Sequence, residues 1–297
     1  MKQQRYVLIT AARNEEAYIE KTLKSVVNQT VLPEKWVIIS DGSTDRTDEI
    51  VTQYAKKHDF IQLIRADSDA QRNFGSKVKA VNYGYQIVKK ETFAFVGNLD
   101  ADISLNPLYY EYILKKFAAN DALGVAGGHR YDNYKGRFIK VNCALNSVGG
   151  PYQLFRRDCF EKIGGFIPLE YGAEDAAAEI SARMYGWQVK SFPEIMSYHH
   201  RCTGGATRNV FKSLFRNGYR LYVIGYHPLF YTLSAIRKVT GKPYLGSLVE
   251  LAGFYWAGAR RFQRPVSDKF INYLRSEQMT RMTAYLRSRK DPAMAGE

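Results

Sequence analysis

Two aspartates, Asp100 and Asp102, stand one residue apart directly after the apolar run 93–96. In extended backbone the two side chains would share one side of a strand, whereas in a turn they would splay apart. Neighbouring carboxylates repel each other unless a cation or protons neutralise them. A hard divalent ion accepts such oxygen ligands and completes its shell with water and substrate phosphates. The same spacing suits an Asx turn or a helix cap, so the place of the pair in the fold decides between these local roles and a metal site.

Short apolar runs alternate with segments of helical periodicity along the first hundred residues. We expect strands at 6–11, 36–40, 60–64 and 93–96, and helices at 14–28, 46–57 and 75–90. This alternation predicts βαβ units with a mostly parallel sheet. Ligands bind such sheets beyond the carboxyl ends of the strands. The loops 11–16, 41–45 and 98–102 should therefore meet at one crevice, which favours a metal site for the aspartate pair.

The pattern is less regular after Asp102. We expect helices at 105–120, 157–163 and 175–185, strands at 123–128 and 187–192, and irregular structure with a strand within 142–155. Gly164 should end the second of these helices, and Pro193 should end the last strand.

Several separated motifs, taken in order, resemble the family 2 glycosyltransferases, which are inverting enzymes that use nucleotide-diphosphate sugars. The motifs are ITAARNEE (Ile9–Glu16), SDGSTD (Ser40–Asp45), the segment Asn73–Gly84 and LDAD (Leu99–Asp102), within a resemblance that runs from about Val7 to Arg201. The resemblance implies an α/β fold of the GT-A type. This fold is Rossmann-like, with a mostly parallel central sheet flanked by helices, here followed by a helical, basic C-terminal extension.

The resemblance also implies a donor site. The nucleotide would lie along Ala11, Ala12, Arg13, Glu15, Asp41 and Ser43, and the diphosphate would meet Lys77, Asp100 and Arg201. Many family members have proline and an aromatic residue where this chain has Ala12 and Arg13. Arg201 could bind phosphate through two hydrogen bonds, and Lys77 either reaches the diphosphate or faces solvent.

Tandem histidines, His199 and His200, stand where family members often carry a histidine. A single histidine is more often a buried structural residue than a ligand, but a tandem pair at this place favours a role beside the metal. We choose His200, with Asp100 and Asp102, as ligands of Mn²⁺ or Mg²⁺.

An acidic pair, Glu174 and Asp175, opens the expected helix 175–185. By themselves such residues only suit the positive end of a helix dipole. The resemblance implies that Asp175 is the general base and that Glu174 orients the acceptor or caps the helix. A positioned carboxylate contributes roughly 10²- to 10⁴-fold to such a proton transfer. Glu179, one turn further on, we interpret as structural.

The net charge of +14 is unevenly distributed. Residues 201–297 hold 17 Lys/Arg and 5 Asp/Glu, a net charge of +12, whereas residues 1–200 hold 26 and 24, a net charge of +2. This asymmetry indicates an acidic partner, either a membrane surface, a phosphate-bearing substrate or nucleic acid. We therefore divide the chain into a catalytic domain, 1–210, with a nucleotide-binding half (1–102) and an acceptor half (103–210), and an extension, 211–297.

Two apolar stretches in the extension, 221–236 and 244–259, fall short of the ~20 residues of a spanning helix. Basic residues flank both stretches, which suits helices lying in a membrane interface. The alternatives are a helical appendage packed on the catalytic domain and a dimer contact.

Three cysteines with no close pair, and an N-terminus without a secretory signal, predict a reducing compartment. We expect a cytoplasmic protein, located at the inner face of the cell membrane if the extension binds lipid.

The leading hypothesis is an inverting, metal-dependent hexosyltransferase that moves a sugar from a UDP-sugar to a carbohydrate or lipid-linked acceptor in surface polysaccharide or glycolipid assembly. A nucleotidyltransferase is one alternative, but residues 11–16 lack its glycine-rich basic loop. A basic protein that binds nucleic acid or a membrane surface is the other, although no nucleic acid is expected as a partner.

Overall fold

The computed structural model describes residues 5–66, 74–142, 144–170, 172–201, 210–239 and 245–290. The predicted motif segment Asn73–Gly84 therefore begins one residue outside the described part. The chain divides into two units, Met1–Gly205 and Ala206–Glu297. The sequence places its boundary near residue 210, and the functions it assigns to the parts remain predictions.

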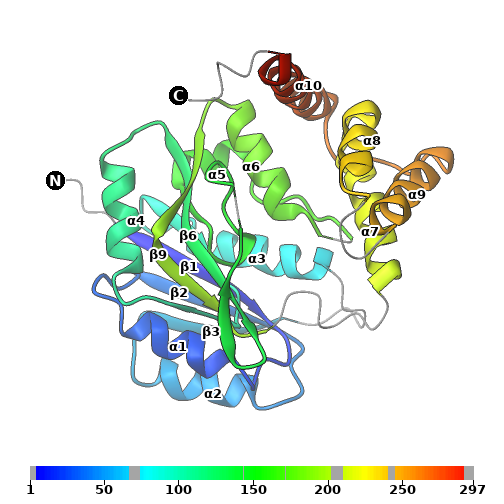
Figure 1. Ribbon diagram of the computed structural model, residues 1–297. Helices are drawn as coiled ribbons and strands as arrows, with labels where there is room; N and C mark the ends of the chain where they lie inside the picture. The colour runs from blue at the N-terminus through cyan, green and yellow to red at the C-terminus, as the bar shows by residue number, and fades with distance from the viewer. Residues whose placement is uncertain are drawn as a thin grey trace. The chain divides into compact units, whose positions relative to one another are not determined.

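The first half of the N-terminal unit is a run of βαβ units (Figure 1). Its elements are β1 (Tyr6–Ala12), α1 (Ile19–Val27), β2 (Lys35–Asp41), α2 (Thr47–Ala55), β3 (Ile61–Ala66), α3 (Phe74–Val88) and β4 (Phe95–Asn98). The strands pair in parallel in the order β3-β2-β1-β4. This confirms the predicted strands and helices, except that α1 begins at Ile19 and not at Asn14. Asn14 has a left-handed backbone, with φ 55°, and so belongs to a loop.

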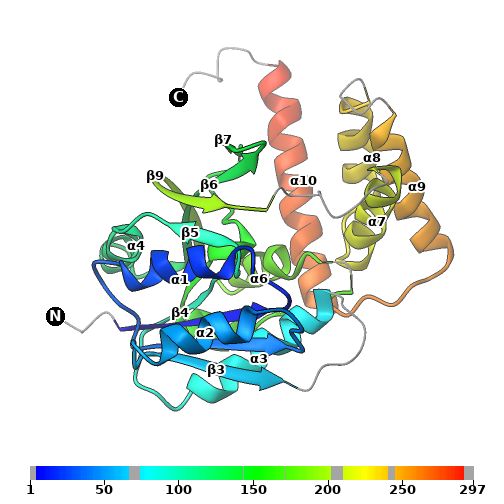
Figure 2. The same cartoon turned by 90° about the horizontal axis from the view of Figure 1, so that it is seen from below.

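The second half extends this sheet with mixed pairing. Its elements are β5 (Ile103–Leu105), α4 (Tyr109–Ala118), β6 (Leu123–Tyr134), β7 (Arg137–Lys140), a 3₁₀ turn (Gly150–Tyr152), β8 (Leu154–Arg156), α5 (Arg157–Ile163), α6 (Glu174–Met184) and β9 (Gln188–His199). The sheet continues from β4 in the order β8-β6-β9-β5, and β7 folds back on the end of β6 (Figure 2). β9 is parallel to β6, whereas β8 is antiparallel to both β4 and β6.

Three expected boundaries in this half are wrong, and the first is that β6 runs to Tyr134, whereas we expect that strand to end at residue 128. The last strand does not end at Pro193 but runs on to His199, and a register shift against β6 accommodates the interruption. The helix expected from Leu105 begins at Tyr109, because Leu105 pairs with β9 as part of the short strand β5. Neither β5 nor β7 is predicted from the sequence.

The long strands β6 and β9 determine which residues meet at the far side of the sheet. Asp132 of β6 lies opposite His199 of β9, and Ile103 of β5 also pairs with His199. Because Ile103 directly follows Asp102, this pairing brings the aspartate turn against the end of β9.

Helices cover both faces of the sheet, with α1 and α2 on one side and α3, α5 and α6 on the other (Figure 1). Residues 6–9 of β1 are accordingly fully buried, as expected for a parallel strand covered on both faces. Gly84 lets α3 approach closely, since a Cβ atom there would lie 2.6 Å from Ile9 Cγ2. On the other side, Tyr110 of α4 stacks on Tyr6 with ring centroids 4.4 Å apart.

The C-terminal unit is helical. It contains α7 (Val210–Val223), α8 (Pro228–Arg237), α9 (Gly246–Ala259) and α10 (Asp268–Lys290). α7 and α9 touch through their backbones, because a Cβ atom on Gly218 would lie 1.8 Å from the Glu250 carbonyl oxygen, and one on Gly253 would lie 2.1 Å from that of Phe215. No helix in the described part of the chain is both long and apolar enough to cross a membrane.

The backbone contact predicts that Gly253→Ala destabilises this unit, although alanine is the better helix former by about 1 kcal/mol. Overpacking of this kind costs roughly 1–3 kcal/mol. Urea unfolding followed by circular dichroism checks the prediction. Gly258→Ala is the matched control, because its Cβ would meet only the movable Tyr222 ring, at 3.3 Å. Equal midpoints for the two variants would contradict the backbone contact.

Candidate active site

Buried hydroxyl groups fix the turn that follows β4. Thr10 Oγ1 donates to the Leu99 carbonyl over 2.6 Å, and Thr22 Oγ1 donates to the Ala101 carbonyl over 2.7 Å. Both threonines are fully buried. Buried carbonyl groups need such partners, so β1 and α1 hold the two aspartates of this turn in place.

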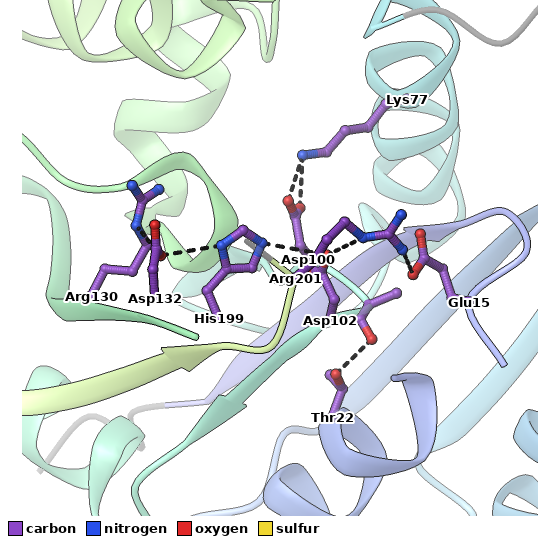
Figure 3. A network of polar contacts seen from close by, with 10 residues as sticks. Glu15, Thr22, Lys77, Asp100, Asp102, Arg130, Asp132, His199 and Arg201 are labelled. Atoms are coloured by element: carbon purple, nitrogen blue, oxygen red, sulfur yellow. Dashed lines mark hydrogen bonds and ion pairs between the residues drawn. The ribbon is translucent and has the colours of Figure 1, made fainter. Parts of the chain in front are cut away.

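The two aspartates splay toward different cations (Figure 3). Lys77 Nζ lies 2.7 Å from Asp100 Oδ1. Asp102 Oδ2 accepts a hydrogen bond from Arg201 Nε over 3.1 Å and lies 3.4 Å from His199 Nε2. The backbone forms a turn at Asp102, which separates the side chains. Each negative charge therefore has positive partners from other parts of the fold.

A row of alternating charges extends from Asp102 along β9 and β6. His199 lies between Asp102 and Asp132, with Nδ1 3.2 Å from Asp132 Oδ1, and Arg130 Nε lies 3.0 Å from the same oxygen (Figure 3). Burial opposes the charge on His199, but Asp102 and Asp132 outweigh it and raise its pKa. Burial likewise opposes the charge on Asp102, yet His199 and Arg201 lower its pKa. These pairs favour an ionised carboxylate at Asp102.

Arg201 joins this row to the end of β1. Its Nη2 donates to the Glu15 carboxylate, and its guanidinium lies over the Tyr18 ring, 5.1 Å from the centroid. The Glu15 backbone N–H donates to Thr47 Oγ1 over 2.7 Å, which ties the loop to the start of α2. Arg201 thus contacts both Glu15 and Asp102, which the predictions from the sequence assign to the same site.

The predicted nucleotide loops are linked by hydrogen bonds. Asn14 Oδ1 accepts from the Thr44 N–H over 2.8 Å, and Ser43 Oγ accepts from the Asn14 N–H over 3.2 Å. Arg13 Nη1 lies 3.5 Å from Asp41 Oδ2. The carboxyl ends of β1 and β2 therefore present one continuous polar surface.

Two further predicted nucleotide contacts, Ala11 and Ala12, are the last residues of β1 and pair with β2. Ser43 lines a cavity of about 810 Å³ beside α2 and the end of β3. The alanines offer backbone at the crevice, and the cavity gives space beside the second loop.

Lys77 connects the aspartate turn to the start of α6. It lines one small cavity together with Glu174 and Asp175. Burial opposes the lysine charge, but Asp100 first and then Glu174 raise the Lys77 pKa well above its ordinary value. Burial raises the pKa of Glu174, while the Lys77 charge acts against that rise. The Lys77 ammonium group therefore lies beside both the predicted donor side, at Asp100, and the predicted acceptor side, at Glu174 and Asp175.

Two other residues shape this cavity. A Cβ atom on Gly150 would lie 2.5 Å from Asp175 Oδ2, so only glycine leaves room for the carboxylate. Asn98 Nδ2 donates to the Gly150 carbonyl over 2.8 Å. Asn98 Oδ1 is buried and has no hydrogen-bond partner within the described ranges. Such an acceptor is suited to a ligand hydroxyl.

Glu179 anchors the loop that carries Gly150. Its carboxylate accepts hydrogen bonds from the Val148 N–H (2.6 Å), Ser147 Oγ (2.9 Å) and Gln153 Nε2 (3.1 Å). These contacts support the structural interpretation of this residue. Burial dominates its electrostatics and raises the Glu179 pKa to about 7, although the hydrogen bonds favour the charged form.

The His200 backbone N–H donates to the Asp102 carbonyl over 2.9 Å, but the His200 side chain contacts other residues. Its Nε2 lies 2.9 Å from Ser104 Oγ, and its ring packs edge-on against Phe138, with centroids 5.5 Å apart. The side chain of its neighbour His199 contacts the Asp102 carboxylate instead. The role of His200 as a metal ligand therefore stays a prediction.

The aspartate turn fits a hard divalent cation in the chemistry of its donors. Asp100 and Asp102 supply carboxylate oxygens, and the pKa of Asp102 is lowered, so that it remains charged. Within the residues whose placement is described, no three His, Cys, Asp or Glu side chains gather as a ready metal site. Water and substrate oxygens would have to complete the shell.

The sequence singles out His199 only as part of the tandem pair with His200, and it does not single out Asp132 or Asn98. A signal for His199 exists in the burial alternation of β9, where it follows Ile195 and Ser197 on the buried side. Because the prediction from the sequence ends the strand at Pro193, it leaves His199 outside the strand and does not use this alternation. Asp132 is 67 residues away from His199, and no local pattern links the two.

The α/β fold, with its mixed central sheet flanked by helices, is of the GT-A type. The structure resembles the mannosyltransferase PcManGT from Pyrobaculum calidifontis in complex with GDP-Man and Mn²⁺, at a TM-score of 0.55 and 17% identity, over 95% of this chain and 86% of that one. It also resembles Staphylococcus aureus TarS 1–349 in complex with UDP-GlcNAc, at a TM-score of 0.53 and 19% identity, over 91% and 79%. At these identities the likeness concerns the fold alone.

The chain belongs to glycosyl transferase family 2, because residues 7–167, more than half of its length, match that family. Poly-beta-1,6-N-acetyl-D-glucosamine synthase of Staphylococcus epidermidis is 26% identical over 209 residues, which cover 64% of this chain and 48% of that protein. The enzyme of that name from Staphylococcus aureus strain COL matches to the same extent. The chain spans about half the length of these curated relatives.

The buried Glu179 carboxyl predicts a pH-dependent stability. Its pKa is raised from 4.5 to about 7, so the folded state keeps a proton that the unfolded state releases between these values. The free energy of unfolding should therefore fall as pH rises through this window, by up to about 3 kcal/mol. Glu179→Gln cannot titrate and should gain stability relative to the wild type over the same range. Denaturant unfolding of both proteins from pH 4.5 to 8 measures this, and a constant difference between them would show the prediction to be wrong.

Proposed function

We propose that the chain transfers a sugar from a UDP-sugar to an acceptor hydroxyl with inversion at the anomeric carbon. One observation carries the proposal: Lys77 lies against Asp100 and lines a cavity with Asp175. The aspartate turn assigned to the diphosphate and the carboxylate assigned to the acceptor are therefore neighbours, as a single displacement requires.

The choice of UDP rests on the relatives. The TarS structure contains UDP-GlcNAc, and the staphylococcal relatives are named as synthases of an N-acetylglucosamine polymer. The mannosyltransferase structure contains GDP-Man, so guanine is the competing base. We assign the nucleoside to Ala11, Ala12, Arg13, Glu15, Asp41 and Ser43, and the diphosphate to Lys77, Asp100 and Arg201.

Asp175 is the proposed general base. Its carboxylate takes the proton of the acceptor hydroxyl while that oxygen forms a bond to the anomeric carbon. The bond from this carbon to the diphosphate oxygen breaks in the same step, so an α-linked donor gives a β-linked product. Glu174 orients the acceptor, and Lys77 and Arg201 offer positive charge to the departing diphosphate.

Asp100 and Asp102 would hold Mn²⁺ or Mg²⁺, with His200 as a further candidate ligand. Such an ion offsets the negative charge that develops on the leaving diphosphate. Two similar structures support this choice, since PcManGT and GalNAc-T7 are both described with Mn²⁺.

The acceptor we propose is a growing polysaccharide or a glycolipid. The names of the staphylococcal synthases support a polysaccharide of N-acetylglucosamine. A lipid-linked acceptor would place the enzyme at the inner face of the cell membrane, which is consistent with the +12 charge of residues 201–297.

Metal-dependent donor binding should be visible in thermal unfolding. UDP with Mn²⁺ at 100 times its dissociation constant stabilises by ~2.7 kcal/mol, roughly 5–10 °C for a unit of this size. The shift should disappear in EDTA and in Asp102→Asn, each compared with its own ligand-free midpoint. GDP, dTDP, CDP and ATP, each with Mn²⁺, are the comparison nucleotides. A larger shift with GDP would overturn the choice of base, and an equal shift in EDTA would overturn the metal.

The general base is tested by substitution. Asp175→Asn should lower turnover by roughly 10²- to 10⁴-fold and leave the UDP thermal shift intact, because the residue acts on the acceptor. UDP release from UDP-GlcNAc with an N-acetylglucosamine oligosaccharide as acceptor measures the turnover. Glu174→Gln, at the adjacent position, should lower turnover less than Asp175→Asn does. Wild-type turnover in Asp175→Asn would refute the assignment.

A further inference from the structure

The outer face of α9 is apolar along its whole length. Leu248, Ala252, Tyr255 and Ala259 recur at intervals of four, three and four residues and are all exposed. This spacing places them on one side of the helix. An exposed face without any charged side chain is unusual for a helix in water, because such faces normally carry the polar residues.

A second apolar row lies on α8, next to that face. Leu229, Leu233 and Ile236 follow the same helical spacing and are exposed by 49%, 45% and 56%. Thr232 Oγ1 and Tyr255 OH share a hydrogen bond of 2.7 Å, so the outward edges of the two helices lie side by side. We call the combined surface of Leu229, Leu233, Ile236, Leu248 and Tyr255 the α8–α9 face.

Only one acidic residue occurs in these two helices, and it points inward. Glu250 Oε1 accepts from Asn217 Nδ2 over 2.7 Å, and Oε2 accepts from Tyr231 OH over 3.3 Å. The carboxylate is thus held by α7 and α8. The α8–α9 face therefore carries no negative charge that would oppose an anionic surface.

Positive charges flank the face. Arg237 ends α8 and Lys238 follows it, Arg260 and Arg261 follow α9, and all four are exposed. Residues 201–297 as a whole carry a net charge of +12. Two copies of so basic a unit would repel each other, whereas an anionic surface attracts each copy.

We propose that the α8–α9 face docks on an anionic lipid bilayer, with the apolar rows in the interface and the flanking cations at the lipid headgroups. With 14 residues, α9 is about 21 Å long, shorter than the ~30 Å hydrocarbon core, so the helices lie in the surface. This inference concerns the C-terminal unit alone and does not depend on the donor or acceptor proposed above.

Vesicle flotation of the full chain tests the proposal. The wild type should bind vesicles of phosphatidylcholine with phosphatidylglycerol and should bind phosphatidylcholine alone much more weakly. The double variant Leu233→Asp/Leu248→Asp should bind at least tenfold more weakly, because it lacks two leucine side chains that the wild type buries in the bilayer interface. Lys238→Gln/Arg260→Gln/Arg261→Gln should weaken binding to the anionic vesicles by about fivefold per charge.

Leu32→Asp is the matched control. Leu32 is exposed by 46%, like Leu233 and Leu248, but lies in the N-terminal unit, so this variant should bind as the wild type does. Circular dichroism shows whether each variant is folded. Equal binding by the double variant, or no wild-type binding to anionic vesicles, would overturn the proposal. Sedimentation that reveals a dimer in the wild type and a monomer in the double variant would show instead that a second copy covers the face.

Discussion

Compensation of the two aspartate charges at the end of β4 is the constraint on which the site depends. A buried carboxylate costs several kcal/mol unless it is paired, so the buried Asp102 requires cations at defined places, and the partly buried Asp100 has a cation beside it as well. Lys77 comes from α3, His199 from β9 and Arg201 from the segment that follows β9. The ends of β1, β4 and β9 must therefore converge. The register of β5 on β9 and the threonine bonds to the turn are the means by which the fold achieves this.

The same cations give the site its capacity for a charged ligand. Lys77 and Arg201 each hold an aspartate and also offer donors that suit phosphate oxygens. Arg201 has five N–H donors, so bonds to Asp102 and Glu15 leave capacity for another acceptor. Asn98 Oδ1, which is buried and has no partner in the described ranges, adds an acceptor to this set of donors. The site thus holds both kinds of group that a sugar diphosphate needs.

Local patterns in the sequence predict the first four strands, their helices and the loops at their carboxyl ends, because apolar runs and helical periodicity are short-range signals. The resemblance to family 2 glycosyltransferases, rather than a local pattern, implies that Glu15, Asp102 and Arg201 belong to one site. Non-local features escape such signals. The pairing of Asp132 with His199 depends on register between strands far apart in sequence, and β9 passes Pro193 because a bulge is available there. The sequence does not decide between His199 and His200, because their different contacts depend on how far that strand runs.

The two units differ in how they accommodate charged and apolar side chains. In the N-terminal unit charged side chains are buried, and each pair described above satisfies them with an opposite charge or a hydrogen bond. In the C-terminal unit α7 and α9 meet backbone against backbone, at Gly218 and Gly253, and side chains such as Phe254 and Phe270 are buried, while other large apolar side chains of α8 and α9 point outward. Burial of those side chains within the unit would require a further layer of structure. A lipid interface provides an apolar layer without any further layer of protein. The excess of arginine and lysine in residues 201–297 favours a lipid interface that is anionic.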